Sequence, residues 1–246
     1  MPFDAPDQLD LSRTIQETWI ERVHYYETVE STNTTALEWA RENEPGGVEL
    51  FIAERQSGGR GRGSNVWWSA PGALTFSLLT VPFDLPPEQL PRVSLTVGLA
   101  ICKTVERFAE RFGVALKWPN DVYLAERKVA GILIELAASM PKRLVIGIGL
   151  NVNNLARDAP CELRSTAISL RDTLPEAGLF DRTEVLIECL RQVEGQLERL
   201  LSGDQSLPGD WQDYSLLNGQ QVRVVTPGHE IAGLCESIAD DGALIV

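Results

Sequence analysis

Two arginines stand among glycines between residues 57 and 63, in a chain whose formal net charge is -13. Residues 57 to 67 have the sequence Ser-Gly-Gly-Arg-Gly-Arg-Gly-Ser-Asn-Val-Trp. Glycine permits backbone conformations with positive φ and lets the main chain approach a ligand closely. The guanidinium groups of Arg60 and Arg62 are planar donors that suit a carboxylate or a phosphate. These residues therefore predict a loop that binds an anion.

A flexible, solvent-exposed turn could have the same composition. Apolar segments on both sides favour the binding loop, because residues 49–53 and 73–79 have the pattern of strands. Two strands would hold the loop at both ends, as binding loops on rigid scaffolds are held.

A second group of candidate residues centres on two lysines. Lys117 begins the sequence Lys-Trp-Pro-Asn-Asp-Val, and Lys128 begins the sequence Lys-Val-Ala-Gly-Ile-Leu-Ile-Glu. The proline favours an extended backbone before it, and the side chains of Asn120 and Asp121 can bond the main chain locally. Taken alone, this pattern is typical of an ordinary turn with surface lysines. Beside an anion-binding loop, it predicts two more cations for the same ligand.

The elements that must position these residues follow from periodicity and from helix and strand breakers. We expect helices at 34–43, 93–112 and 182–201, a strand at 23–29, and short strands between 114 and 152. Residues 202–210 resemble a linker, and β-type segments follow at 221–225, 230–233 and 243–246. The chain thus predicts an α+β fold, with a mixed sheet, packed helices and a small barrel-like β domain. The expected domains are residues 1–205 and 210–246.

Composition limits the class of protein. A chain of 246 residues that is 43% hydrophobic can bury one sizeable core and a small second domain. The chain has no run near the roughly 20 apolar residues of a membrane span. Its first seven residues also lack the pattern of a secretory signal. We therefore predict a cytoplasmic protein without a membrane partner. The excess of acidic residues also argues against a nucleic-acid partner, because such binding depends on many lysines and arginines.

The cysteines and histidines do not predict a metal site. The four cysteines are widely spaced and form no CxxC pair, so we expect reduced packing residues rather than disulfides or zinc ligands. They are Cys102, Cys161, Cys189 and Cys235. Two histidines are too few for a metal cluster built on histidine.

The chain resembles the biotin protein ligases (biotin–acetyl-CoA-carboxylase ligases) in five blocks, which follow the order and approximate spacing of that family. The blocks are Glu30 to Asn33, Gln56 with Gly59 to Gly63, Lys117 to Asp121, Lys128 to Glu135, and Gly147 to Asn153. The resemblance spans about residues 23–153 and continues more weakly to the C-terminus. It implies a catalytic domain related to class II aminoacyl-tRNA synthetases and lipoate ligases, followed by a small SH3-like domain.

The resemblance implies a two-step reaction. The carboxylate of biotin attacks the α-phosphate of ATP, which gives biotinyl-5′-AMP and pyrophosphate. A lysine of a biotin carboxyl carrier protein then attacks the anhydride. Mg²⁺ would arrive with ATP, and the sequence does not identify its ligands.

The resemblance also assigns roles to residues. Lys128 and Arg62 would be catalytic, because they offset the repulsion between carboxylate and phosphate. The expected biotin-binding residues are Ser31, Thr32, Asn33, Gln56, Gly59, Arg60, Gly61, Arg62, Trp67, Lys128 and Gly131. The expected ATP-binding residues are Arg62, Lys117, Asn120, Asp121 and Asn151.

The chain departs from the family in three places. Many bacterial members carry further arginines after the position of Arg62, whereas Gly-Ser-Asn-Val-Trp follows here. The segment before residue 23 is too short for the winged helix-turn-helix of some members, so we do not expect transcriptional repression. The chain also ends where members usually continue, so the expected C-terminal domain is small or incomplete.

Two other functions remain open from the sequence. A lipoate or octanoate ligase or transferase could share the fold, although the Gly-Arg loop and the Lys-Trp-Pro-Asn-Asp block favour biotin. A non-catalytic sensor of biotin or nucleotide is the other alternative, and release of pyrophosphate would separate it from an enzyme. The sequence leaves open whether the chain forms a homodimer.

Overall fold

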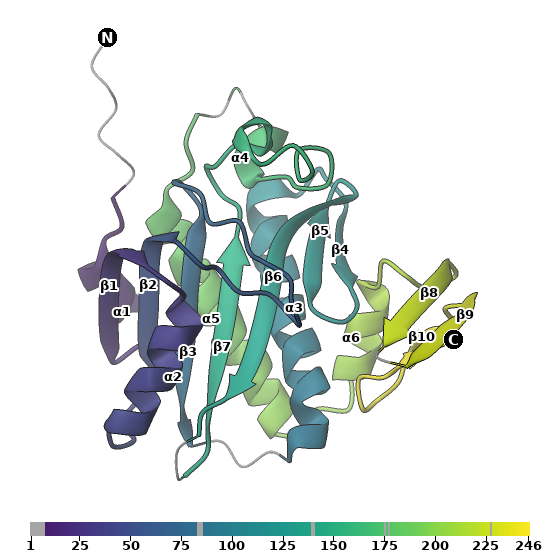
Figure 1. The fold of residues 1–246 in the computed structure, drawn as a ribbon, viewed down its shortest axis with the longest axis horizontal. Helices are drawn as coiled ribbons and strands as arrows, with labels where there is room; N and C mark the ends of the chain where they lie inside the picture. The colour runs from purple at the N-terminus through teal and green to yellow at the C-terminus, as the bar shows by residue number, and fades with distance from the viewer. Residues whose placement is uncertain (1–7, 83–85, 139–140, 175, 177, 227) are drawn as a thin grey trace.

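A mixed seven-stranded sheet forms the centre of the molecule (Figure 1). This computed structural model describes residues 8–246 except 83–85, 139–140, 175, 177 and 227, so the expected absence of a secretory signal at residues 1–7 falls outside it. The strand order is β1-β2-β3-β7-β6-β5-β4, with β1 and β2 parallel and the other neighbours antiparallel. The strands are β1 (Arg22–Val29), β2 (Glu49–Gln56), β3 (Leu74–Pro82), β4 (Val114–Lys117), β5 (Asp121–Leu124), β6 (Arg127–Leu136) and β7 (Arg143–Leu150). The mixed sheet predicted from the sequence is confirmed.

Helices cover both faces of this sheet, so its central strands are buried on both sides. Helix α2 (Thr32–Glu42) lies on one face, and α3 (Leu90–Ala109) and α5 (Arg182–Leu201) lie on the other (Figure 1). The larger hydrophobic cluster fills the space under α3 and α5, and a smaller one packs α2 against β2, β3 and β7. Every residue of β7 is buried. The loops at the ends of these strands therefore start from a rigid scaffold.

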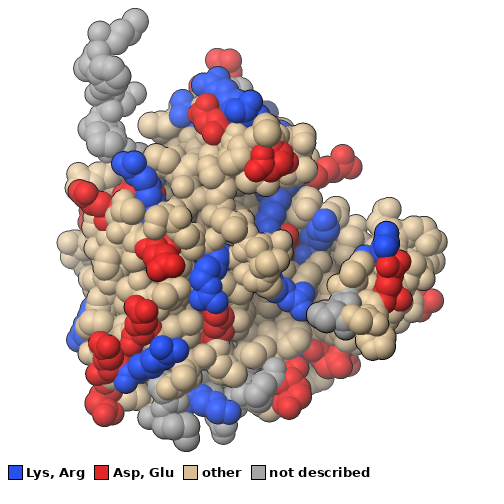
Figure 2. All heavy atoms as spheres, viewed as in Figure 1, with Lys and Arg blue, Asp and Glu red and all other residues tan. Residues whose placement is uncertain are grey.

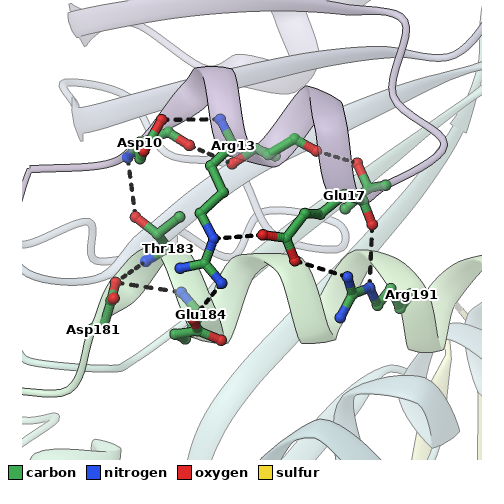
Figure 3. Close-up of polar contacts among 9 residues, drawn as sticks. Asp10, Arg13, Glu17, Asp181, Thr183, Glu184 and Arg191 are labelled. Carbon is green, nitrogen blue, oxygen red and sulfur yellow. Dashed lines mark hydrogen bonds and ion pairs between the residues drawn. The ribbon is translucent and has the colours of Figure 1, made fainter.

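Helix α1 (Leu11–Glu17) is held against α5 by charged side chains (Figure 3). Arg13 lies 2.6 Å from Glu17 and 2.5 Å from Glu184, and Arg191 of α5 lies 2.9 Å from Glu17. Water and salt screen ion pairs at the surface, so these contacts orient α1 more than they stabilise it.

The segment expected to be a linker is helical in its second half. Helix α6 (Leu207–Asp213) begins there, and its Leu207 and Trp211 are fully buried in the larger hydrophobic cluster. The hydroxyl of Tyr214, just after α6, donates to Glu106 of α3 at 2.5 Å. Burial raises the pKa of that hydroxyl, and the bond to Glu106 raises it further. The linker prediction is wrong at residues 207–210, because proline and glycine in a first helical turn resemble a loop in sequence.

The remaining short elements follow or flank this framework. They are the 3₁₀ helices Pro87–Gln89 and Ala156–Asp158, helix α4 (Leu170–Thr173), and strands β8 (Gln221–Thr226), β9 (His229–Leu234), β10 (Ser237–Ile238) and β11 (Leu244–Ile245). The last four strands make two antiparallel pairs, β8 with β9 and β10 with β11. A small C-terminal β part is thus present, as expected, while the boundary between the two domains stays a prediction.

Replacing Trp211 by alanine is expected to lower the free energy of unfolding by about 3–5 kcal/mol, because it leaves a cavity in the core. Urea denaturation followed by circular dichroism measures this loss. Leu201→Ala is the matched control, since that side chain is 59% exposed at the end of α5. Equal stability of the two variants would show that α6 does not belong to the main core.

The cysteines are free thiols. Burial raises the pKa of Cys102, Cys189 and Cys235, so these residues fit the expected packing role. Cys161 is exposed, and the packing prediction is wrong for it. Among the helices of the described residues, none is both long and apolar enough to cross a membrane.

Candidate active site

A cleft of about 780 Å³ lies on the face of the sheet that carries α2. Lysine and arginine side chains surround the hollow between the sheet and the C-terminal hairpins (Figure 2). Thirteen of the predicted site residues line this cleft: Ser31, Thr32, Asn33, Gln56, Arg60, Gly61, Arg62, Trp67, Lys117, Asn120, Asp121, Lys128 and Gly131. The structure therefore brings together segments that are up to a hundred residues apart in the chain.

The other two predicted residues lie next to the cleft. Asn151 lines an adjoining hollow of about 140 Å³, which shares Trp67 and Lys128 with the main cleft. Gly59 is a buried residue of the Gly-Arg loop (residues 57–67). A Cβ atom at this position would lie 2.4 Å from the carbonyl oxygen of Trp67. Only glycine permits this close approach of two backbone segments.

The Gly-Arg loop connects β2 to β3 and has a defined conformation. The N–H of Gly61 donates to the carbonyl of Asn65 at 2.8 Å, and the N–H of Trp67 donates to the carbonyl of Gly59 at 2.9 Å. The N–H of Gly58 bonds the carbonyl of Glu30, which ties the loop to the end of β1. The prediction that two strands hold this loop is confirmed.

The first turn of α2 forms a polar wall of the cleft. The Oε1 atom of Gln56 accepts hydrogen bonds from the N–H and the Oγ1 of Thr32, at 2.7 and 3.1 Å. Gln56, at the end of β2, thus takes the role of an N-cap side chain, because it accepts a hydrogen bond from one of the free N–H groups in the first turn of α2. Ser31 makes no capping bond, although it is buried and lines the cleft. Its hydroxyl is therefore available to a ligand.

Asn33 continues this wall. Its Oδ1 accepts from Ser77 Oγ at 2.6 Å, and its Nδ2 donates to Glu135 Oε2 at 2.8 Å. Ser77 is fully buried on β3 and also contacts Thr32 Oγ1 at 2.8 Å. The amide of Asn33 is thus held on both sides.

The cations of the cleft have different partners. Lys128 Nζ lies 2.7 Å from Asp121 Oδ1, and Lys117 Nζ donates to the hydroxyl of Tyr123 at 3.0 Å. Arg60 is paired with Glu135 at 2.6 Å. Within the described residues the Arg62 side chain makes no hydrogen bond or ion pair, and it is exposed. The two arginines therefore differ in their protein contacts, a difference that the sequence did not predict.

A β-bulge turns Lys128 into the cleft. On β6 the register shifts, so that Val122 pairs with Ala130 and Tyr123 pairs with Lys128. Val129 is the extra residue, and the bulge puts Lys128 on the same face as Gly131, although they are three residues apart. A Cβ atom at Gly131 would lie 3.3 Å from Lys128 Nζ.

Glycines on β6 and β7 make the floor of the cleft flat. A Cβ atom at Gly149 would lie 2.2 Å from the Trp67 ring, and one at Gly147 would lie 2.1 Å from Asn33 Oδ1. Trp67 and Asn33 can therefore lie directly on the sheet. Gly131 is among the biotin-binding residues that the resemblance implies, whereas Gly147 and Gly149 are not. The signal in the sequence is a Gly-x-Gly pair inside a strand. Alternate residues of a strand share one face, so such a pair leaves that face without side chains and lets another group lie close to it.

Gly147→Ala is expected to weaken binding of the ligand at this wall by about tenfold to a hundredfold, because Asn33 must give up buried hydrogen bonds. Isothermal calorimetry with biotin measures the change. Gly195→Ala on α5 is the matched control, since a Cβ atom there meets nothing within 4 Å. Equal affinity of both variants would show that the position of Asn33 does not matter.

Some residues of the cleft were not predicted at all. Phe76 and Ile148 line it from β3 and β7, Leu163 from the segment after β7, and Val224 and Val225 from β8. The sequence contains no signal for the last three, because they reach the cleft only through tertiary folding.

The cleft offers one carboxylate to a magnesium ion that arrives with nucleotide phosphates. Among the described residues that line the cleft, Asp121 is the one carboxylate, and no group of three potential metal ligands occurs in the described chain. Mg²⁺ at nucleotide sites commonly uses one or two carboxylates together with substrate phosphates and water. Asp121 is the described cleft carboxylate that such an ion could use, and in this structure it is paired with Lys128.

Comparisons with known proteins agree with this geometry. Residues 25–153 match the model of the biotin/lipoate A/B protein ligase family. The chain is 32% identical over 225 residues to the bifunctional ligase/repressor BirA of Bacillus subtilis. The aligned region covers 90% of this chain and 68% of that protein. It is 33% identical over 218 residues to the biotin–acetyl-CoA-carboxylase ligase of Mycobacterium tuberculosis, which covers 87% of this chain and 79% of that protein.

A solved structure has the same fold. The biotin protein ligase from Aquifex aeolicus, in complex with biotin and ATP, superposes with a TM-score of 0.77 at 30% identity, covering 92% of this chain and 91% of that one. The matched family region contains the polar wall, the Gly-Arg loop and both lysines of the cleft. The chain therefore belongs to the biotin/lipoate A/B protein ligase family, and within it to the biotin protein ligases.

Proposed function

We propose that this protein is an ATP-dependent ligase that activates biotin as biotinyl-5′-AMP and transfers it to a lysine of a biotin carboxyl carrier protein. One observation carries the proposal: a single cleft joins the polar wall of α2 to the cations Arg62, Lys117 and Lys128. The relative from M. tuberculosis is named for this activity, and the A. aeolicus structure contains biotin and ATP.

In the proposed complex the polar wall binds the head of biotin. Ser31 offers its hydroxyl, Gln56 holds Thr32 by two hydrogen bonds, and Ser77 contacts both Thr32 and Asn33. Trp67 lies against Gly149 and covers the apolar part of the ligand. Gly59, Gly61 and Gly131 allow the loop and the sheet floor to come close to it.

The first chemical step brings two anions together. Arg62 and Lys128 offset the repulsion between the biotin carboxylate and the α-phosphate, and they stabilise the charge that develops at phosphorus. Lys117, Asn120 and Asp121 contact the nucleotide in the cleft, and Asn151 contacts it from the adjoining hollow. Mg²⁺, when bound with ATP, neutralises phosphate charge. Much of the rate enhancement then comes from positioning, because the reactants are already aligned.

In the second step the amine of the carrier lysine attacks the carbonyl carbon of the anhydride. The C–N bond forms, the C–O bond to AMP breaks, AMP leaves with the electron pair, and the attacking nitrogen gives up a proton to solvent. Arg62 and Lys128 stabilise the departing phosphate in the same way as in the first step.

Exchange of labelled pyrophosphate into ATP tests the first step directly. We expect exchange with biotin and none with lipoate or octanoate, followed by transfer of labelled biotin to a carrier domain. Exchange driven by lipoate would instead favour the lipoate branch of the family. Tight biotin binding without any exchange would indicate a sensor and overturn the proposal.

A further inference from the structure

Glu135 connects two parts of the cleft that are far apart in the sequence. Its Oε1 accepts from Arg60 of the Gly-Arg loop at 2.6 Å, and its Oε2 accepts from the Nδ2 of Asn33 on α2 at 2.8 Å. Glu135 lies on β6 opposite Val145 of β7, with 22% of its side chain exposed. It is not among the residues that line the cleft.

The Glu135 carboxylate and the backbone carbonyl of Leu133, which accepts from the same Nδ2 at 3.3 Å, together set which way the amide of Asn33 points. A carboxylate only accepts hydrogen bonds, so the NH₂ group of Asn33 must face Glu135. The carbonyl oxygen then faces Ser77, which donates to it at 2.6 Å, and lies over Gly147, where no Cβ atom fits. Reversing the amide would turn its oxygen toward the carboxylate and leave Glu135 without its partner.

The same carboxylate restrains the Gly-Arg loop. Glycines at 59, 61 and 63 give this loop large conformational freedom, and ordering it costs conformational entropy. The ion pair between Arg60 and Glu135 fixes the middle of the loop to the sheet before any ligand binds. Arg62, two residues later, then projects from a loop whose position is already set.

We propose that Glu135 is a positioning residue for this site: it tethers the loop through Arg60 and orients Asn33, without touching the ligand. The inference rests on the proposed function, because its consequence is measured on biotin activation. Preorganisation of this kind acts equally on the bound substrate and on the transition state, so its loss raises KM and leaves kcat nearly unchanged.

Glu135→Gln tests the proposal with little change of volume. The glutamine amide has one acceptor oxygen, whereas the carboxylate has two. Because Arg60 and Asn33 both donate to this side chain, one of them loses its acceptor. We expect the KM for biotin in pyrophosphate exchange to rise about tenfold or more, with kcat within about twofold of the parent. Glu188→Gln is the matched control, because Glu188 of α5 forms the same kind of pair with Arg107, at 2.5 Å. Its KM should stay at the parent value.

Limited trypsin digestion gives a second readout that does not depend on activity. Cleavage after Arg62 should be faster in Glu135→Gln than in the parent and in Glu188→Gln, because the tether is gone. If Glu135→Gln does not fold, Arg60→Gln removes the same ion pair by changing the residue of the loop. The cleavage rate of that variant then tests whether the ion pair restrains the loop.

The outcomes separate this inference from the proposed function. An unchanged KM and an unchanged cleavage rate would overturn the role of Glu135 even if the parent is an active ligase. A fall in kcat at constant KM would also overturn it, since that indicates a contact made in the transition state. A parent without biotin-dependent exchange would refute the proposed function, and the digestion would still test the tether.

Discussion

Replacement of Lys128 by alanine is expected to abolish biotin-dependent pyrophosphate exchange, with a loss on the order of a thousandfold. Two effects combine in this variant. The cation that stabilises the reacting carboxylate and phosphate is removed, and Asp121, which lies 2.7 Å from Lys128, is left as an uncompensated negative charge in the cleft. Like charges near the site then disfavour both anionic substrates.

The measurement is the exchange rate at saturating ATP and biotin, with the thermal midpoint recorded for each protein. Lys142→Ala is the control, because Lys142 is exposed just before β7 and does not line the cleft. We expect both variants to keep the fold. Exchange at the parent rate in Lys128→Ala would remove this lysine from the catalytic residues.

Arg62→Gly is expected to release biotinyl-AMP about tenfold to a hundredfold faster than the parent. This range corresponds to the loss of one or two charge-assisted hydrogen bonds to the adenylate phosphate. Arg62 is suited to this role because it is exposed at the cleft, and none of the described residues forms a hydrogen bond or ion pair with its side chain. Its guanidinium can therefore turn to the ligand without breaking a contact.

The released intermediate can be quantified by chromatography after incubation with biotin, ATP and pyrophosphatase. Arg111→Gly is the matched control, since Arg111 is exposed beyond the end of α3 and lies outside the cleft lining. If Arg62→Gly released no more biotinyl-AMP than Arg111→Gly, retention of the intermediate would have to depend on other residues.

The different partners of Arg60 and Arg62 predict different defects. Arg60 is engaged by Glu135, so its loss should affect the order of the loop and the binding of biotin. Arg62 should affect the lifetime of the adenylate. In the sequence both arginines stand between glycines, and only the family resemblance separates them, since it implies catalysis and ATP binding for Arg62 but not for Arg60.

Local signals in the sequence determined the main elements. The helix expected at 182–201 is observed as α5 (Arg182–Leu201), and the apolar segments around the Gly-Arg loop are β2 and β3. These predictions hold because hydrophobic periodicity and breakers act over a few residues. Thirteen candidate residues share one cleft because the first turn of α2, the loops of the sheet and strand β6 meet on one face of the sheet.

The tertiary structure alone decided how these residues are aimed and paired. The bulge at Val129 puts Lys128 into the cleft, Glu135 separates the roles of the two arginines, and Val224 reaches the same cleft from the C-terminal hairpin. Strand register, long-range hydrogen bonds and the burial of Trp211 join residues that are far apart in the chain. Such contacts depend on the packing of the whole sheet, so no short stretch of sequence contains them.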